Sequence, residues 1–356
     1  MSNLKVAALQ LGFYAGLFRL VQLTARYQAR ILTFHRFSGN GEGHTRGLPV
    51  QKFAEYMEYL TRHYRVVSLG DLVAELQRGE LQPYTTAVTI DDGYHEVFSL
   101  IAPVLRRYRI PASFFVVSEF ADGRLWLWTD QFRFVFEHAP RGRVAFRYNG
   151  SIYNVEMQTE GDRRRSEKQW REYAKRLPQV ERQELLLTIA EAWEIKIPAT
   201  PPREFQPMTW GQLQTLAAEG FDVGGHTRTH PILSHVDFAQ LQDEIVGCKE
   251  QIERNIGIPV RHFAYPNGYR EDYTLVAVEA VVRAGYQAAV TTELPHHTTS
   301  VSLFELPRLD AAVEDLPHFA QTVSGFERAK LETRAQFKRM SDRLRVFSRS
   351  RPAKGG

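Results

Sequence analysis

The sequence predicts an α/β protein in which about seven β/α units form an incomplete, (β/α)7-type barrel. Short segments that are apolar on both faces alternate with amphipathic helical segments, a pattern typical of parallel strands covered by helices. The alternation runs over residues 28–123, stops, and resumes over residues 205–323. We therefore expect one barrel made of these two stretches, with residues 124–204 inserted into it as an α+β subdomain.

The first stretch contains four predicted strands separated by helices. Its first strand ends in His35, and its third is a β-branched, apolar segment followed directly by Asp91, Asp92 and Gly93. The expected strands are 30–35, 65–69, 86–90 and 112–117, and the expected helices are 50–64, 71–78 and 98–108.

The inserted segment and the second stretch differ in the elements that their sequences predict. In the insertion we expect a helix up to residue 138, a hairpin over 144–157 that turns at Asn149-Gly150, and helices at 163–177 and 180–195. This segment could form a lid beside the site. The second stretch predicts helices at 209–219, 237–256 and 272–284 and strands at 221–224, 262–265, 288–292 and 303–311.

The two ends of the chain differ from the barrel in composition. Residues 4–23 are mostly apolar, but Gln10, Arg19 and Gln22 interrupt them, so we expect an N-terminal amphipathic helix (residues 1–27) that packs on the domain or lies on a membrane surface. In residues 327–356, ten Lys or Arg stand against three acidic residues, which makes residues 324–356 a basic C-terminal tail. The remaining chain is slightly acidic, and this argues against a nucleic-acid-binding body.

Asp91 and Asp92 stand at the end of a buried strand, where two carboxylates are costly unless they are paired, hydrogen-bonded or metal-bound. One of them could hold a cation while the other stays free as a base. The alternative is that the Asp-Asp-Gly sequence only caps the helix that follows.

His226 and His230 form a second group, four residues apart after a strand and a Gly-Gly turn. In a parallel barrel the ends of all strands meet at one face, so these histidines and Asp92 could face a single cation with open positions for water and substrate. The alternative is that both are hydrogen-bonded loop residues.

These segments resemble the polysaccharide deacetylases of carbohydrate esterase family 4, which share the nodulation-type (NodB) chitooligosaccharide deacetylase domain. The resemblance rests on Thr89-Ile90-Asp91-Asp92-Gly93, on His226-Thr227-x-x-His230, on Met208-Thr209-Trp210 and on Phe263-Ala264-Tyr265-Pro266-Asn267-Gly268. It implies a deformed β/α barrel, a divalent metal that is usually zinc, and removal of acetyl groups from sugars.

The resemblance also implies roles for individual residues. Asp91 matches the catalytic base, and Asp92, His226 and His230 match the metal ligands. Asn267 matches the position whose backbone amide stabilises the oxyanion.

Two positions depart from the family pattern. Ala264 occupies the place of the arginine that holds the base, and we expect Arg308 on the last strand to replace it; alternatively Arg308 pairs with Asp310 or a surface acid. For the catalytic acid we expect His35, because some deacetylases of this type are circularly permuted; Leu316-Pro317-His318 has the letters of the family's late motif but lies at the start of a predicted helix.

Four aromatic residues are candidates for stacking on sugar rings, although aromatic residues next to apolar segments are more often part of a core. They are Tyr94, Trp126, Trp128 and Tyr265.

The sequence therefore predicts a metal-dependent enzyme that removes an acetyl group from an N-acetylated sugar in a polysaccharide, glycolipid or sugar precursor. One alternative is a catalytically silent, metal-containing carbohydrate-binding barrel, and another is an amidase for a small non-sugar amide. The single cysteine, Cys248, and the absence of a convincing export signal favour a cytoplasmic protein, at the inner membrane face if the two ends contact lipid, that serves cell-surface polysaccharide biosynthesis.

Overall fold

A nearly closed barrel of parallel strands organises the protein. The computed structural model describes residues 3–39, 47–292 and 302–326. The predicted basic tail therefore lies outside the described residues, apart from its first three positions, 324–326. The barrel strands follow the order β12-β11-β10-β9-β6-β5-β1-β13, and β4 pairs with β5 outside this path. They are β1 (Arg30–Phe34), β4 (Arg65–Val66), β5 (Thr85–Ile90), β6 (Ala112–Val116), β9 (Asp222–Gly225), β10 (His262–Ala264), β11 (Ala288–Thr291), β12 (Leu306–Pro307) and β13 (Leu309–Asp310). This arrangement confirms the predicted α/β barrel.

The barrel closes at a single residue, Arg308. We predicted one strand over 303–311, but the structure divides it into β12 and β13, which follow each other in the chain and pair with opposite ends of the sheet. Val290 of β11 is in register with Leu306, and Leu32 of β1 is in register with Leu309. The break at Arg308 lets one short segment pair with both edge strands.

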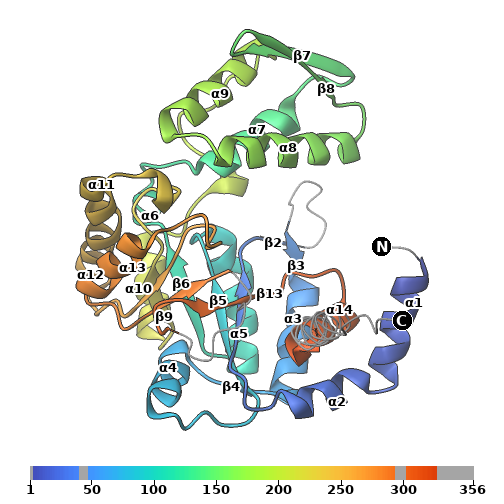
Figure 1. The fold of residues 1–356 in the computed structure, drawn as a ribbon, viewed down its shortest axis with the longest axis vertical. Helices are drawn as coiled ribbons and strands as arrows, with labels where there is room; N and C mark the ends of the chain where they lie inside the picture. Colours follow the sequence, from blue (N-terminus) through green and yellow to red (C-terminus); the bar gives the residue numbers. More distant parts are fainter. Residues whose placement is uncertain (1–2, 40–46, 293–301, 327–356) are drawn as a thin grey trace, which may run out of the picture.

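Helices cover the outside of the barrel (Figure 1). They are α3 (Val50–His63), α4 (Leu69–Arg78), α5 (Ala102–Tyr108), α10 (Trp210–Ala218), α11 (Phe238–Gln242), α12 (Cys248–Ile256), α13 (Leu275–Arg283) and α14 (Leu316–Ser324), with the short α6 (Ser118–Ala121) above β6. Two predicted helices contain a π turn, Val97–Ile101 before α5 and Asp243–Gly247 between α11 and α12. Pro103 lies in the first turn of α5 and lacks a backbone N–H, which the wider π turn accommodates.

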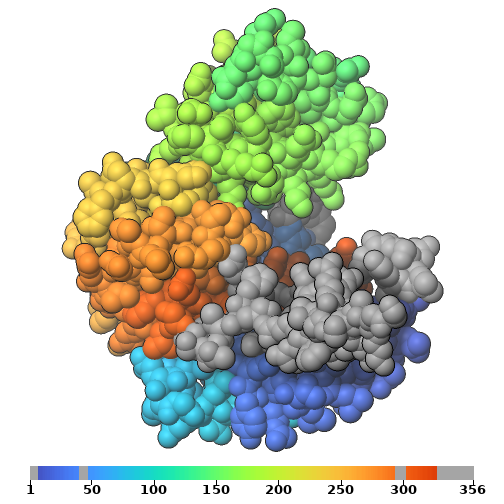
Figure 2. Space-filling model, in the orientation of Figure 1, coloured from blue at the N-terminus to red at the C-terminus, as the bar shows by residue number. Residues whose placement is uncertain are grey.

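The inserted segment has a hydrophobic core of its own. Its elements are α7 (Trp128–His138), the hairpin β7 (Arg143–Tyr148) and β8 (Ser151–Glu156), α8 (Glu160–Lys175) and α9 (Gln179–Ala192). The hairpin turns at Asn149-Gly150 as expected, both with positive φ. In Figure 2 the segment (green) stands out as a separate lobe above the barrel. A short 3-10 turn, Arg203–Phe205, leads back to the barrel.

The N-terminal region forms two helices instead of the expected one. α1 (Asn3–Tyr14) and α2 (Leu17–Thr24) are separated at Gly16, which adopts a left-handed conformation with φ of 75°. Both helices pack beside α14, and α2 buries Phe18 and Gln22. Among the helices formed by the described residues, none combines the length and the apolar character needed to cross a bilayer.

The loop after β1 makes a small parallel pair of its own. β2 (Phe37–Ser38) pairs with β3 (Leu48–Pro49) at the start of α3. Phe34, Phe37 and Phe53 contact one another edge to face or tilted in this region, so the end of β1 is anchored in the core just before and after His35.

Candidate active site

The predicted site residues meet at one end of the barrel because their strands are parallel and in register. Phe34 of β1 is level with Ile90 of β5, so His35 and Asp91 leave the sheet side by side. Val116 of β6 is level with Gly225 of β9, and the backbone N–H of His226 donates to the Val116 carbonyl at 3.0 Å. The carboxyl ends of parallel strands are where such barrels hold their sites.

Left-handed backbone turns separate the functional side chains at this edge. Four of the eight described non-glycine residues with positive φ lie here: Asp92, Thr227, His230 and Asn267. Such conformations cost free energy and cluster at functional sites. At Asp92, with φ of 71°, the turn ends the strand, so that adjacent Asp91 and Asp92 can reach different partners.

Asp91 is held by Arg308 in a fully buried, two-pronged ion pair. The two Nη atoms of Arg308 donate to the two carboxylate oxygens of Asp91, each at 2.7 Å. Further bonds run from Arg308 to the Thr89 hydroxyl and to the Thr291 carbonyl, both at 3.1 Å. Burial works against the ionised form, but Arg308 and the neighbouring histidines outweigh it and lower the pKa of Asp91. Arg308 therefore pairs with Asp91 and not with Asp310 or a surface acid.

His35 lies on the open side of Asp91. Its Nε2 is 3.5 Å from Asp91 Oδ2, and its side chain is 43% exposed, whereas Asp91 is buried. It is thus the candidate that an incoming molecule can reach. His318, by contrast, lies in the first turn of α14, where its ring contacts Asp315, the residue that caps the helix.

Asp92, His226 and His230 converge on one point. The Nε2 atoms of both histidines lie 3.6 Å from Asp92 Oδ1, and the three ligand atoms are all within 4.8 Å of one another. A metal bonded at its usual distances would hold such atoms roughly 3.0–3.5 Å apart. All three residues are buried.

The hydrogen bond of His226 indicates that this cluster suits a cation. Its Nδ1 lies 2.7 Å from the Ala264 carbonyl, which can only accept, so Nδ1 must carry a proton. In the neutral ring, Nε2 then presents a lone pair to the Asp92 carboxylate, and the two repel unless a proton or a metal cation lies between them. Oxygen and nitrogen donors of this kind fit a divalent metal such as zinc.

The charges in the cluster shift the pKa values in opposite directions. Burial disfavours ionised Asp92, but its contacts with His226 and His230 lower its pKa overall. Burial likewise opposes protonation of His226, yet Asp92 and Asp91 raise its pKa. For His230, burial and the charge of His226 lower the pKa to about 4, which keeps this ring neutral and able to ligate.

Glu244 fixes the loop that carries the two histidines, and sequence analysis missed it. This buried carboxylate accepts from the backbone N–H groups of Arg228 and Thr229, each at 2.8 Å, and from the Thr229 hydroxyl. The backbone N–H of His230 donates to the hydroxyl oxygen of Thr227 at 3.0 Å and further fixes this loop. Glu244 lies in a helical segment among other charged residues, so nothing in the sequence separates it from a surface acid.

Asn267 lies in the loop after β10, next to the strand of His226. Its φ of 58° and that of Gly268, 76°, make a tight left-handed turn. Among the described residues, its buried side-chain Nδ2 has no hydrogen-bond partner. A donor without a partner beside a reactive cluster can serve a bound molecule.

The four aromatic candidates are not placed for stacking on a sugar. Tyr94 is 2% exposed, because Arg36 covers its ring face at 3.9 Å and its hydroxyl donates to Asp130 at 2.6 Å. Tyr265 is fully buried, stacks on Tyr273 at 4.4 Å and donates to the Phe304 carbonyl.

The two tryptophans are buried in the insertion. Trp126 packs between Phe134 and Phe205, and the guanidinium of Arg182 covers the ring of Trp128 at 4.4 Å. A ring whose faces are covered cannot stack on a pyranose, so the structure argues against this role for all four residues. They serve the core, which is the alternative that the sequence left open.

The insertion contacts three of the site loops. Asp130 of α7 accepts from Tyr94 in the loop after β5, and Lys175 of α8 pairs with buried Asp272 at 2.9 Å in the loop after β10. Ile232, two residues after His230, belongs to the insertion's own core. The loops of Asp92, His230 and Asn267 are therefore all braced by this segment.

Comparison with known proteins identifies relatives. A family model described as polysaccharide deacetylase matches residues 78–160 and 168–289. The structure is similar to the Streptococcus pyogenes deacetylase PplD, solved in complex with acetate, with 15% identity, a TM-score of 0.55 and coverage of 84% of this chain and 99% of that one. It is also similar to a polysaccharide deacetylase from Bacillus cereus, with 16% identity, a TM-score of 0.50 and coverage of 83% and 68%. These structural likenesses support the fold, and no curated protein matches the chain.

If Asp92, His226 and His230 bind a metal, removing one donor should weaken binding strongly. We expect the wild-type protein to bind about one zinc ion per chain and His230→Ala to bind it more than roughly a hundredfold more weakly. His235→Ala is the matched control, because His235 follows in the same segment and is exposed. Titration calorimetry of folded variants would measure this; equal affinity in all three proteins would contradict the assignment.

Proposed function

Because this chain belongs to the polysaccharide deacetylase family, we propose that it is a metal-dependent hydrolase that removes an acetyl group from an N-acetylated sugar. The observation that carries the proposal is that two adjacent carboxylates at one strand end have different partners. Asp91 is ionised and held by Arg308, while Asp92 faces two histidines whose ring nitrogens could ligate a metal together with it. A base beside a metal site is what amide hydrolysis by water requires.

Asp92, His226 and His230 would hold the metal, and their donor set fits zinc. When bound, the metal supplies Lewis-acid polarisation of the acetyl carbonyl and a lowered pKa for water. Asp92 contributes a negative charge, and the two neutral imidazoles leave the site with a net positive charge once it is loaded.

Asp91 is assigned as the general base that takes the proton of the attacking water. Its lowered pKa keeps it ionised at neutral pH, and the Arg308 fork fixes its orientation. Arg308 also replaces the arginine that the family carries where this chain has Ala264. Its side chain comes from the closing strand and reaches the same carboxylate from a different part of the chain.

His35 is assigned as the acid that returns a proton to the leaving amine. It is the exposed titratable group next to Asp91, and its position at the end of β1 lets it approach a substrate from the solvent side. Asn267, through its backbone N–H, is assigned to the developing oxyanion; its unpaired side-chain amide is a further donor in the same turn.

We expect an N-acetylated sugar in a polysaccharide, glycolipid or sugar precursor, used in cell-surface polysaccharide synthesis at the cytoplasmic side. A silent carbohydrate-binding barrel would have no use for a buried arginine that orients a second carboxylate, and the Asp91–Arg308 pair therefore favours an enzyme.

The activity can be tested by acetate release from N-acetylhexosamine oligomers and nucleotide sugars, with small cyclic imides and amides in the same panel. We expect zinc-loaded wild type to release acetate and Asp91→Asn to lose at least ~100-fold in kcat while it retains zinc, because only the proton acceptor is removed. Turnover of the non-sugar amides alone would point to an amidase. Bound zinc without turnover of any panel member would favour the silent barrel.

The acid can be tested by comparing two histidines. His35→Ala should lower kcat by at least ~100-fold with a smaller change in KM, because the proton donor to the leaving amine is removed. His318→Ala, at the other histidine that fits a family motif, should leave kcat within about twofold, since its ring hydrogen-bonds Asp315 in the first turn of α14. The opposite result would transfer the role of the acid to His318.

A further inference from the structure

Helix α2 is apolar on the side that it buries and on the side that it exposes. Phe18 is buried against the body of the protein, while Leu17, Leu20 and Leu23 are 43%, 62% and 50% exposed. Their spacing of three residues places them in one stripe along the outward face. Leu11 and Tyr14 of α1 are also exposed. An apolar surface of this extent on one short segment indicates an interaction site.

The charged residues among the first 30 are all basic. The first 30 residues contain no Asp or Glu, and Arg19 and Arg26 are exposed among the leucines. The described chain ends beside the same helices: Phe326 contacts Phe18 with ring centroids 5.8 Å apart, and α14 packs on α1 and α2. The segment that follows, residues 327–356, has seven more basic than acidic residues. The N-terminal helices and the segment that continues from Phe326 are thus both basic in sequence.

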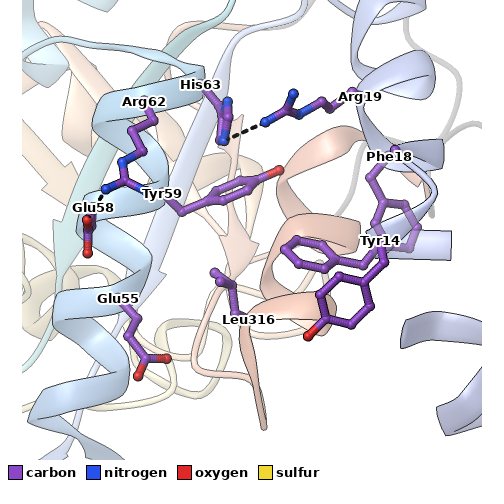
Figure 3. A pocket seen from close by; sticks show the side chains of 11 residues that line it. Tyr14, Phe18, Arg19, Glu55, Glu58, Tyr59, Arg62, His63 and Leu316 are labelled. Carbon is purple, nitrogen blue, oxygen red and sulfur yellow. Dashed lines mark hydrogen bonds and ion pairs between the residues drawn. The ribbon is translucent and has the colours of Figure 1, made fainter. Parts of the chain in front are cut away.

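A cleft of about 450 Å³ opens next to the stripe, between α1, α2, α3 and the start of α14 (Figure 3). Phe13, Tyr14, Phe18 and Tyr59 give it apolar walls. Arg19 reaches across to His63, with 3.3 Å between Nη2 and Nε2, and Arg62 comes from the same turn of α3 as His63. Glu55 and Glu58 line the same cleft, and Glu58 pairs with Arg62, so the positive charge on this side lies on the outward arginines of α2 and its end and not in the cleft.

We propose that the outward face of α1 and α2 docks on an anionic phospholipid membrane. In this arrangement the leucine stripe enters the boundary between headgroups and acyl chains, and Arg19 and Arg26 lie at the level of the phosphates. The surplus of positive charge in residues 327–356, which continue from Phe326, adds attraction to the anionic lipids.

This arrangement explains why α2 is apolar on two sides. One face is covered by the protein, and lipid covers the other, as in helices that lie in the plane of the interface. It does not depend on the deacetylase activity, since the helices lie on the barrel wall and contribute no residue to the metal cluster or to the Asp91–Arg308 pair.

Vesicle co-sedimentation of the full chain tests the proposal. We expect binding to vesicles of phosphatidylcholine with phosphatidylglycerol and much weaker binding to phosphatidylcholine alone, with a decline at high salt. The triple variant Leu17→Ser/Leu20→Ser/Leu23→Ser should bind the anionic vesicles at least ~10-fold more weakly, because three partly inserted leucines contribute well over 1.4 kcal/mol. Circular dichroism would verify that the variant is folded.

The matched control removes the same apolar character elsewhere. Val180→Ser/Leu187→Ser/Leu275→Ser replaces residues that are 80%, 51% and 62% exposed on α9 and α13, and it should bind as wild type does. Equal loss in both triple variants, or no vesicle binding by the wild type, would overturn the proposal. So would a dimer in light scattering that only the α2 variant dissolves, because a second copy would then cover the stripe.

Discussion

The ion pair between Arg308 and Asp91 is the interaction on which the rest of this structure depends. The backbone of Arg308 separates β12 from β13 at the point where the barrel closes, and its side chain is buried inside the barrel. A buried charge pair is expensive to desolvate, and removing one partner of such a pair typically costs about 3–5 kcal/mol. Here the two-pronged geometry and the bonds of Arg308 to Thr89 and Thr291 compensate the cost of desolvating the pair. The result is a carboxylate that stays ionised inside a protein core.

The neighbouring carboxylate has a different environment because the backbone turns between the two. The left-handed turn at Asp92 takes it out of the strand, toward His226 and His230. The outer contacts then complete the arrangement: the Ala264 carbonyl selects the His226 tautomer, Glu244 holds the histidine loop, and Lys175 and Asp130 attach the insertion to the loops on either side. Such supporting contacts orient the ligands and thereby tune the affinity of a site for its metal.

The sequence was a good guide to the strands and to the chemistry at their ends, and a poor guide to everything that depends on distant parts of the chain. The β-branched and apolar segments 86–90 and 112–117 predicted the parallel sheet because apolar residues point to both of their faces, and the polar residues after 86–90 predicted the site. Arg308 could be suspected only because Ala264 left a partner missing. The exposure of Tyr94 and Trp128 could not be predicted, because their covers, Arg36 and Arg182, come from elsewhere in the fold. The break at Gly16 was missed because apolar residues continue on both sides of it.

The most direct test of the account is a crystal structure of the zinc-loaded protein with anomalous data at the zinc edge. The central claim is that adjacent carboxylates have separate tasks. We expect one anomalous peak bonded to Asp92, His226 and His230, with the carboxylate of Asp91 still paired with Arg308 and not bonded to the metal. A peak ligated by Asp91, with Arg308 displaced from it, would contradict the division of roles, and a peak elsewhere in the protein would contradict the site itself.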